Sequence, residues 1–188
     1  EGYAALFEEM MDHPNISVWL GVKAKSVLEI NPQGQDKVLF EGRPFKGEVI
    51  YTGQIDELFE YKYGRLPYRS LRFVFEHYDQ DFFQTHGVVN YTISEAYTRI
   101  TEFKHLTGQT DGNGTTIMKE YPIPYSGDEK EIPYYAIINE ENIALYEQYV
   151  NLLKDIPNLY MLGRLAEYKY YNIDAIVEKA LELAKLIQ

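Results

Sequence analysis

The segment YTRITEF, from Tyr97 to Phe103, and the segment TTIMKEY, from Thr115 to Tyr121, decide the fold of the middle of this chain. Both are rich in β-branched and aromatic residues, which favour strands, and the dipeptides of Asp111-Gly112-Asn113-Gly114 between them are typical of hairpin turns. Two further runs of the same character, Leu71 to His77 and Gly87 to Thr92, precede them. We therefore predict an antiparallel β-sheet over this region.

The chain on either side of this sheet alternates between helical and strand patterns. Apolar residues at helical spacing predict a helix from Tyr3 to Met11, a second with Asn139 as its N-cap, and a last helix that follows Asn172. The last helix carries one apolar stripe, formed by Ile173, Ile176, Val177, Ala180, Leu181, Ala184 and Ile187. Short strands are expected at Ser17 to Leu20, Lys23 to Ile30, Lys37 to Phe40, Glu48 to Tyr51 and Leu159 to Leu162, with Trp19 in a core. The fold class is therefore α+β or α/β, with two ends that pack together around an inserted sheet.

Composition and charge exclude several classes of protein. The net charge of −11 argues against nucleic acid as the main partner, because phosphate backbones require a basic stripe. A small anionic ligand held by a few arginines stays compatible, since charge effects at a site are local. The absence of cysteine excludes disulfides, zinc–thiolate sites and cysteine nucleophiles. The sequence has no apolar run long enough for a membrane span and no signal-peptide pattern, so we expect a cytoplasmic protein without a membrane partner.

The stretch GRLAEYKYYN, from Gly163 to Asn172, supports two interpretations. Its glycine permits close backbone approach, its arginine can bind phosphate in a bidentate manner, and its tyrosines combine an apolar face with a polar tip, as a ligand-binding wall requires. The same residue types also suit a helix entry whose aromatic rings cover a core. Residue types alone do not decide between the two.

Arginines provide the other candidate ligand sites. If the strands that carry Asn90 and Arg99 pair, the two side chains share a face and suit a sugar hydroxyl beside a phosphate. Alternatively, Arg99 lies on a solvent-exposed face with Glu102 or Glu95 as its ion-pair partner. A second group is either another anion site or a set of solvated strand ends; it comprises Arg65, Arg69 and Arg72, near Tyr61, Tyr63 and Tyr68.

Metal and nucleotide motifs are absent from the sequence. The histidines lack metal-ligand spacing, so no metal site is expected; they are His13, His77, His86 and His105. No glycine-rich loop has the strand, GxGxxG and helix context of a phosphate-binding loop.

Several short motifs follow one another in a specific order: Tyr51 to Asp56, Leu66 to Phe73, Tyr97 to Ile100 with Glu102 to His105, Lys119 to Pro122, Pro133 to Tyr135, and Gly163 to Tyr171. In this order they resemble the prokaryotic UDP-galactopyranose mutase family, and Gly2 to Met11 resembles the family's helix that precedes them. Each motif alone is weak, whereas the ordered set is highly specific. The resemblance covers most of the chain from about Tyr51 to its end.

The resemblance implies a flavin-dependent isomerase of galactofuranose and cell-surface polysaccharide biosynthesis, which interconverts UDP-galactopyranose and UDP-galactofuranose. In this family reduced FAD attacks the anomeric carbon of the sugar through its N5 atom as UDP leaves, so no side chain is expected to be the catalytic nucleophile. The positions that match substrate-binding residues are Asn90, near the sugar, and Arg99, Tyr135 and Tyr170, on the diphosphate. The positions that match FAD contacts are Tyr51, Thr52, Gly53, Gly163, Arg164 and Asn172.

The chain departs from the family in two respects. Asn172 stands where the family often has Asp, and the two residues are equivalent as helix N-caps. The family's N-terminal GxGxxG loop, its uracil-stacking tryptophan and its mobile-loop arginine are missing, and a helix begins at once although Glu1 is not an initiator Met. We therefore interpret the chain as a C-terminal fragment that alone neither retains FAD nor catalyses the reaction. Dimerisation through apolar surface left exposed is a further expectation.

The resemblance also divides the chain. We expect residues 1–64 and 139–188 to be remnants of a Rossmann-like FAD-binding domain, and residues 65–138 to form the antiparallel substrate-binding sheet inserted in it. UDP-galactose is the expected substrate. The alternatives are a non-catalytic sugar-nucleotide or glycan binding module and a fragment of a flavin-dependent oxidase.

Overall fold

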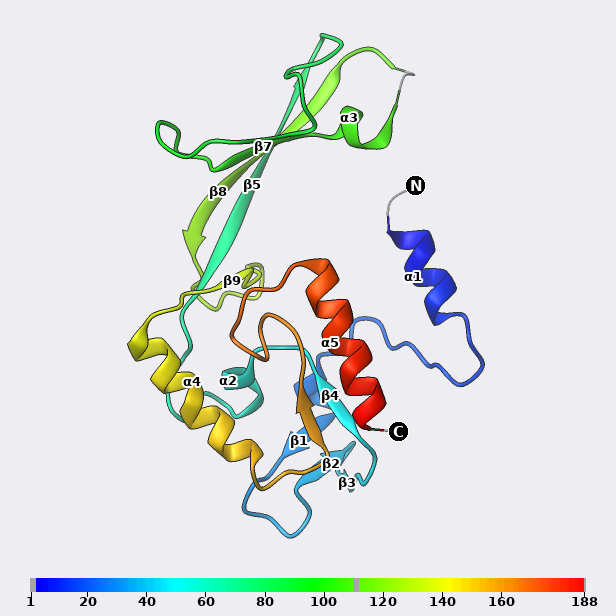
Figure 1. Ribbon diagram of the computed structural model, residues 1–188, viewed down its shortest axis with the longest axis vertical. Coiled ribbons are helices and arrows are strands. Elements are labelled where there is room, and N and C mark those ends of the chain that lie inside the picture. Colours follow the sequence, from blue (N-terminus) through cyan, green and yellow to red (C-terminus); the bar gives the residue numbers. More distant parts are fainter. Residues whose placement is uncertain (1–2, 110–111, 188) are drawn as a thin grey trace. The chain divides into compact units, whose positions relative to one another are not determined.

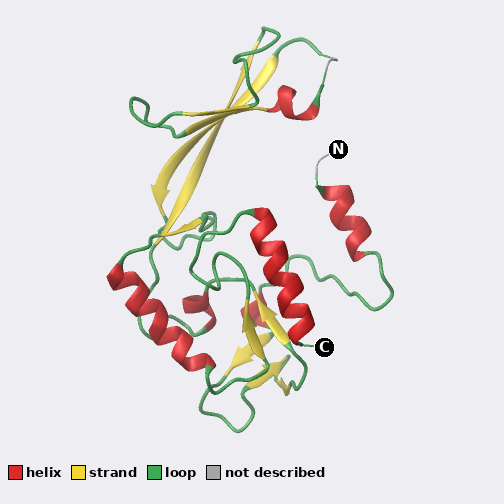
Figure 2. Ribbon diagram, viewed as in Figure 1, coloured by secondary structure: helices red, strands yellow, loops and turns green. Residues whose placement is uncertain are grey.

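A computed structural model describes residues 3–109 and 112–187, which form two compact units (Figure 1). Unit 1 comprises Glu1–Leu20 and Leu71–Ile123, and unit 2 comprises Gly21–Ser70 and Pro124–Gln188. Both units combine helices with strands (Figure 2), which confirms the α+β class.

The predicted antiparallel sheet forms in unit 1, with the strand order β6-β7-β8-β5. Its strands are β5 (Tyr68–Tyr78), β6 (Val88–Asn90), β7 (Arg99–Glu102) and β8 (Thr115–Pro124). The first residues of β5 and the last residue of β8 belong to unit 2, where the Tyr125 N–H donates to the Tyr68 carbonyl at 3.0 Å. The sheet therefore follows the β-branched and aromatic runs of the sequence.

The connection from β7 to β8 contains a short helix that the sequence patterns did not predict. Phe103 ends the strand pattern and begins α3 (Phe103–Thr107), where its ring stacks on that of Phe75 at 6.1 Å. Asp111, part of the expected turn, lies outside the described residues. Gly114 leads into β8 with φ of +91°, and a Cβ at this position would lie 2.6 Å from the Tyr78 carbonyl oxygen, so the position requires glycine.

A buried carboxylate stabilises this sheet. Glu102 is fully buried and accepts hydrogen bonds from the Phe83 N–H at 2.8 Å, the Gln84 N–H at 3.0 Å and the Thr115 hydroxyl at 2.6 Å. Burial alone would raise the pKa of Glu102, but these hydrogen bonds outweigh it and hold the pKa below its usual value. The carboxylate thereby joins β7 to β8 and to the turn before β6.

In the N-terminal segment of unit 1, the predicted helix is confirmed and the predicted strand is wrong. The expected helix forms as α1 (Ala4–Met11). Ser17 to Leu20 is not a strand, and Trp19, which we expected in a core, is 53% exposed. A strand needs a neighbour for its backbone hydrogen bonds, and none of the described strands pairs with this segment.

Unit 2 contains two small sheets with different pairing. The antiparallel one has the order β1-β2-β3, formed by β1 (Leu28–Ile30), β2 (Val38–Phe40) and β3 (Arg43–Pro44). The predicted strand Lys23 to Ile30 forms only at its end, because η1 (Ala24–Ser26) is a 3₁₀ turn. The other sheet is a parallel pair, β4 (Val49–Tyr51) with β10 (Leu159–Met161).

The remaining elements of unit 2 are one short strand and three helices. β9 (Tyr135–Ala136) pairs antiparallel with the start of β5. The helices are α2 (Ile55–Leu58), α4 (Glu140–Leu153) and α5 (Ile173–Leu186). No helix among the described residues is long and apolar enough to cross a membrane.

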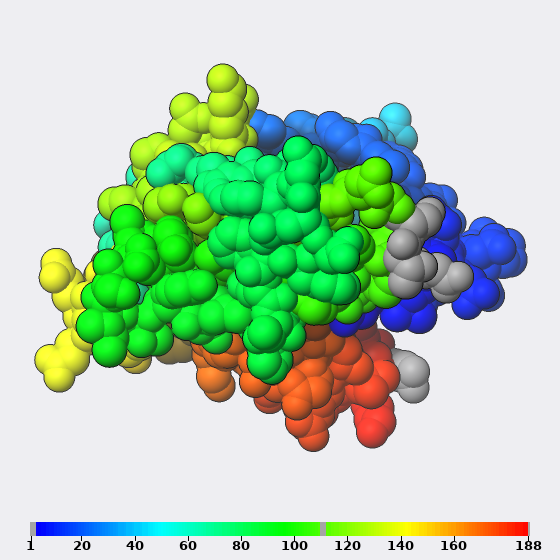
Figure 3. Space-filling model, turned by 90° about the horizontal axis from the view of Figure 1, so that it is seen from above, coloured from blue at the N-terminus to red at the C-terminus, as the bar shows by residue number. Residues whose placement is uncertain are grey.

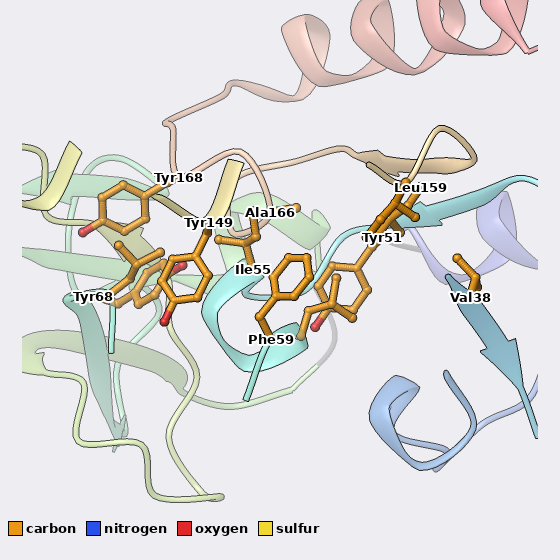
Figure 4. Packing of buried hydrophobic residues seen from close by; sticks show 12 residues of the cluster. Val38, Tyr51, Ile55, Phe59, Tyr68, Tyr149, Leu159, Ala166 and Tyr168 are labelled. Atoms are coloured by element: carbon orange, nitrogen blue, oxygen red, sulfur yellow. The ribbon is translucent and has the colours of Figure 1, made fainter. Parts of the chain in front are cut away.

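The core of unit 2 is rich in tyrosine (Figure 4). Tyr149 is fully buried on α4 and donates to the Gly64 carbonyl at 2.6 Å, while Tyr168 donates to the Pro67 carbonyl at 2.6 Å. Burying a phenol is costly unless its hydroxyl is hydrogen-bonded, and these hydroxyls find backbone partners. The apolar members of the cluster are Val38, Ile55, Leu58, Phe59, Leu66, Ile156, Leu159 and Ala166.

The two long helices of unit 2 begin at the predicted places but differ in their caps and burial. The Asn139 side chain accepts a hydrogen bond from the Asn142 N–H at 2.8 Å, which confirms the predicted N-cap of α4. Asn172 takes the N-cap position of α5, but its side chain makes no capping hydrogen bond. No residue of α5 is buried, so its apolar stripe does not reach the core.

Candidate functional site

Asn90, Arg99 and Glu120 form a cluster in unit 1 that we call the arginine patch. They lie directly opposite one another on β6, β7 and β8. The Arg99 Nε–H donates to Asn90 Oδ1 at 3.0 Å, and Arg99 Nη1 lies 3.5 Å from Glu120 Oε1. The structure therefore brings Asn90 and Arg99 together as their predicted strand pairing required.

The Arg99 side chain in the patch is fixed by two contacts and still exposed to a ligand in solvent. The side chain of Glu120 is 10% exposed, whereas that of Arg99 is 41% exposed. The guanidinium is fixed on two sides, and its remaining N–H donors are not used within the described part of the chain. Such a fork can bind two oxygens of a phosphate at once.

The ion-pair partner of Arg99 is not one of those expected from the sequence. Glu102 is buried on the other face of β7, where its oxygens are occupied by Thr115 and two backbone N–H groups. Glu120 was missed, although alternation along β8 together with the register Arg99 to Glu120 would have identified it.

Tyr135, Arg164 and Tyr170 form a second cluster, in unit 2, that we call the tyrosine patch. The two phenol rings stack with centroids 6.2 Å apart, and the Arg164 guanidinium lies 4.5 Å from the Tyr170 ring and 5.8 Å from the Tyr135 ring. The Arg164 Nε–H donates to the Tyr171 carbonyl at 2.8 Å, which fixes the guanidinium plane. Tyr170 is 59% exposed, so its hydroxyl is accessible to a ligand.

The loop from Gly163 to Asn172 is organised by Glu167. This carboxylate accepts hydrogen bonds from the Gly163 N–H and the Tyr171 hydroxyl, both at 2.8 Å. Burial, reinforced by the hydrogen bond and charge of Glu167, raises the pKa of Tyr171 to about 12. The interpretation as aromatic rings that cover a core is confirmed for Ala166, Tyr168 and Tyr171, which are buried, whereas Arg164 and Tyr170 are not buried and stay predicted ligand-binding residues.

The predicted group of three arginines does not form one site. The Arg65 guanidinium stacks on Tyr61 at 3.9 Å, and that of Arg72 stacks on Tyr121 at 4.4 Å. Arg69 is exposed and lies directly opposite Tyr135 in the pairing of β5 with β9. Arg69 therefore borders the tyrosine patch, a position that only the strand register reveals.

The candidate cofactor residues follow the ends of two paired strands. Tyr51 and Met161 are register partners in the parallel pair β4–β10, and the Leu162 N–H donates to the Tyr51 carbonyl at 3.0 Å. Thr52-Gly53 and Gly163-Arg164 thus leave the same carboxyl edge of this sheet, which is where ligands bind in parallel sheets. Gly163 has φ of +101°, and no atom lies within 4 Å of the place that a side chain would take.

Tyr51 and Asn172 differ in how well their side chains are placed to contact a cofactor. The Tyr51 ring belongs to the core and its hydroxyl donates to the Gln54 carbonyl at 3.3 Å, so only its backbone is available. Asn172 is exposed, and its amide, free of any capping bond, can contact a ligand.

Neither metals nor surface hollows add to the site. No group of metal-ligating side chains occurs among residues 3–109 and 112–187. A hollow of about 860 Å³ in unit 2 is lined by residues of η1, β1 and α2, among them Lys25, Leu28 and Leu58, and contains no residue of the arginine patch or the tyrosine patch.

The chain is similar in sequence to known proteins over nearly its whole length. The sequence model of a family described as UDP-galactopyranose mutase matches residues 1–170. A UDP-galactopyranose mutase of Mycoplasma pneumoniae is 36% identical over 187 residues, which are 98% of this chain and 46% of the relative. A dTDP-fucopyranose mutase of Escherichia coli is 31% identical, covering 99% of this chain and 47% of the relative. A probable UDP-galactopyranose mutase of Klebsiella pneumoniae is 35% identical, with 97% and 44% covered. The chain thus spans about half the length of the curated relatives it matches.

Proposed function

The chain belongs to the UDP-galactopyranose mutase family, and from this premise we propose that it forms the C-terminal part of a flavin-dependent mutase that interconverts UDP-galactopyranose and UDP-galactofuranose. The observation that carries the proposal is the arginine patch, because a guanidinium fixed by Asn90 and Glu120 is suited to the charge of a leaving diphosphate. The tyrosine patch offers phenol hydroxyls to the same class of group.

In this proposal the residues of the chain bind and orient the sugar nucleotide. Arg99 neutralises the negative charge that develops on UDP as the bond to the anomeric carbon breaks, while Asn90 lies near the sugar. Glu120 holds the guanidinium in one orientation, so no reorganisation is needed when the charge appears. Tyr135 and Tyr170 donate hydrogen bonds to diphosphate oxygens, and Arg69, beside Tyr135, adds a second positive charge.

The residues present fit part of an FAD site. Thr52-Gly53 and Gly163-Arg164 leave the carboxyl edge of the parallel pair, and the open space at Gly163 lets a cofactor approach the backbone. Flavin, when bound, supplies the nucleophile for the sugar. We assign residues 1–64 and 139–188 to a Rossmann-like FAD-binding domain and residues 65–138 to the substrate-binding sheet. Because the chain has no GxGxxG loop, we expect it to be inactive alone and not to retain FAD.

Titration with UDP, dTDP and free galactose, followed by calorimetry or by chemical-shift changes, tests the proposal. We expect UDP to bind and Arg99→Ala to weaken it by roughly 10- to 150-fold, because a charged hydrogen bond contributes about 1.5–3 kcal/mol. Arg72→Ala is the matched control, since its guanidinium stacks on Tyr121 in the same unit and should leave the affinity within about threefold. Glu120→Gln should have an intermediate effect.

Three results would contradict the proposal or part of it. Tight binding of free sugar that does not depend on UDP would favour a glycan-binding module. Equal losses of UDP affinity in Arg99→Ala and Arg72→Ala would show that the arginine patch does not bind UDP. Purified chain with nearly stoichiometric flavin absorbance would overturn the expectation that it does not retain FAD.

A further inference from the structure

Asn113 and Gly114 form the single Asn-Gly sequence of the chain. The backbone nitrogen that follows an asparagine can attack the carbonyl carbon of its side-chain amide, because the two atoms are held close together and close a five-membered succinimide ring. Glycine hinders this attack least, since it has no Cβ. The proposed function gives this pair no role, although the pair leads directly into β8.

The side chain of Asn113 is available for this reaction. Asn113 is exposed, and its amide makes no hydrogen bond with the residues that the structure describes. The segments of unit 1 that are drawn in green lie at the surface of the molecule (Figure 3). Water therefore reaches the amide, and no described partner holds it away from the backbone of Gly114.

The imidazole of His77, near the end of β5, lies directly against Gly114. A Cβ built on Gly114 would be 2.7 Å from His77 Nε2. The backbone nitrogen of Gly114 is bonded to the same Cα that would carry this Cβ. His77 Nε2 can therefore exchange a proton with the Gly114 nitrogen, directly or through one water molecule.

The surroundings of His77 keep Nε2 turned toward Gly114. His77 Nδ1 lies 3.1 Å from Thr116 Oγ1, a contact that orients the ring. Asp79 Oδ1 is 3.9 Å from Nε2, too far for a hydrogen bond, so Nε2 stays free to accept a proton. The fold also requires the glycine, because Gly114 has φ of +91° and a Cβ there would lie 2.6 Å from the Tyr78 carbonyl oxygen.

We propose that the folded chain deamidates itself at Asn113, with His77 as the proton-transfer group. The Gly114 nitrogen forms a bond to the side-chain carbonyl carbon of Asn113, and its proton passes to His77 Nε2. The bond between this carbon and the side-chain nitrogen then breaks, and the nitrogen takes the proton from His77 and leaves as ammonia. Water opens the succinimide at either of its carbonyl groups, which gives aspartate or isoaspartate. The reaction consumes one water and releases one ammonia, and nothing is oxidised or reduced.

The modification changes the chain at a sensitive place. Isoaspartate carries its former side-chain methylene in the main chain, so the backbone becomes longer just before Gly114 and gains a negative charge beside it. The next residue, Thr115, begins β8 and donates to the buried Glu102 at 2.6 Å. The proposal is independent of the proposed function, because neither a sugar nucleotide nor flavin takes part.

Peptide mapping by mass spectrometry measures the reaction. The chain is incubated at neutral pH, both folded and unfolded in urea, and the conversion of the amide to an acid at position 113 is followed in time. Electron-transfer fragmentation distinguishes isoaspartate from aspartate. Asn15 and Asn151 are internal controls, since both are exposed but are followed by Ile16 and Leu152.

We expect Asn113 to react about tenfold faster in the folded chain than in the unfolded chain, because only folding places His77 against Gly114. Asn15 and Asn151 should remain amides in both. His77→Gln should lower the folded rate to about that of the unfolded chain, while its amide can still bond to Thr116 and preserve the fold. His86→Gln, at another exposed histidine of unit 1, is the matched control and should keep the wild-type rate.

Two results would overturn the proposal. One is a folded wild-type rate at or below that of the unfolded chain, and the other is equal folded rates in the wild type and His77→Gln. If His77→Gln does not fold, Thr116→Val provides the test, because it removes only the hydroxyl that orients the ring. The folded rate should then fall as well, and an unchanged rate would equally contradict the role of His77.

Discussion

The helices α4 and α5 have the same length of fourteen residues and lie in the same unit, yet they differ in their N-caps and in their burial. α4 begins with a hydrogen-bonded Asn139 cap and buries Tyr149 completely. α5 begins at an Asn172 whose side chain makes no cap and buries nothing. Their amphipathic sequences predict both helices equally well. The difference teaches that an amphipathic pattern predicts a helix, but not how completely its apolar face is buried in the fold.

Truncation of one side chain on each helix should give the largest difference in the free energy of unfolding between α4 and α5. Tyr149→Ala removes a fully buried ring and its hydrogen bond to Gly64, so we expect the free energy of unfolding to fall by about 3–5 kcal/mol. Val177→Ala removes solvent-exposed methyl groups and should change it by less than about 0.5 kcal/mol. Urea denaturation monitored by circular dichroism provides both values. Equal losses of unfolding free energy in the two variants would show that α5 is packed in solution as tightly as α4.

Alkaline pH should act on α4 and not on α5. Burial, with a smaller contribution from the charge of Glu167, raises the pKa of Tyr146 on α4 to about 12. Because the folded pKa lies above the unfolded value near 10, the associated stability is complete below about pH 10 and is lost as the pH rises through about 12. We expect Tyr146→Phe to reduce this loss by about 1 kcal/mol. α5 contains no tyrosine, so Leu181→Ala should keep the wild-type profile.

Denaturation at a series of alkaline pH values, with tyrosinate absorbance as a second probe, checks this prediction. An unchanged loss of stability in Tyr146→Phe would assign the alkaline transition to other buried tyrosines, such as Tyr168 or Tyr171.

Removal of the two N-cap asparagines should give the smallest effects. Asn139→Ala deletes the hydrogen bond to the Asn142 N–H and should cost about 1 kcal/mol. Asn172→Ala deletes no capping bond and should cost only a few tenths of a kcal/mol. Thermal melts of the two variants provide the comparison. A larger loss for Asn172→Ala would mean that its side chain caps α5 in solution.

The sequence predicted those parts of the structure whose causes are local. The β-branched runs became β5, β7 and β8, and the capping residue Asn139 marked the start of α4. Asn90 and Arg99 were placed on one face because strand alternation determines side-chain direction once two strands pair.

The parts that were missed depend on distant partners. Glu120 is beside Arg99 only through the register of β8, and Arg69 is beside Tyr135 only through β9. Ser17 to Leu20 has the composition of a strand but no neighbour among the described strands. The buried role of Tyr168 follows from hydrogen bonds to Pro67 and Ile137, residues far from it along the chain.

The carboxylate of Glu102 also determines how unit 1 acquires its structure in time. Its three hydrogen-bond donors are only 13 to 19 residues away along the chain, so the loops that they close are short and cost little entropy. Contacts between residues close in sequence tend to form early in folding. Burial of an unpaired charge costs free energy, so the carboxylate needs its hydrogen-bond donors by the time it is buried. We therefore expect the contacts of Glu102 with Thr115 and the Phe83-Gln84 turn to form early in folding. Glu102→Gln should then slow folding more than it accelerates unfolding, and stopped-flow folding and unfolding rates measure both effects.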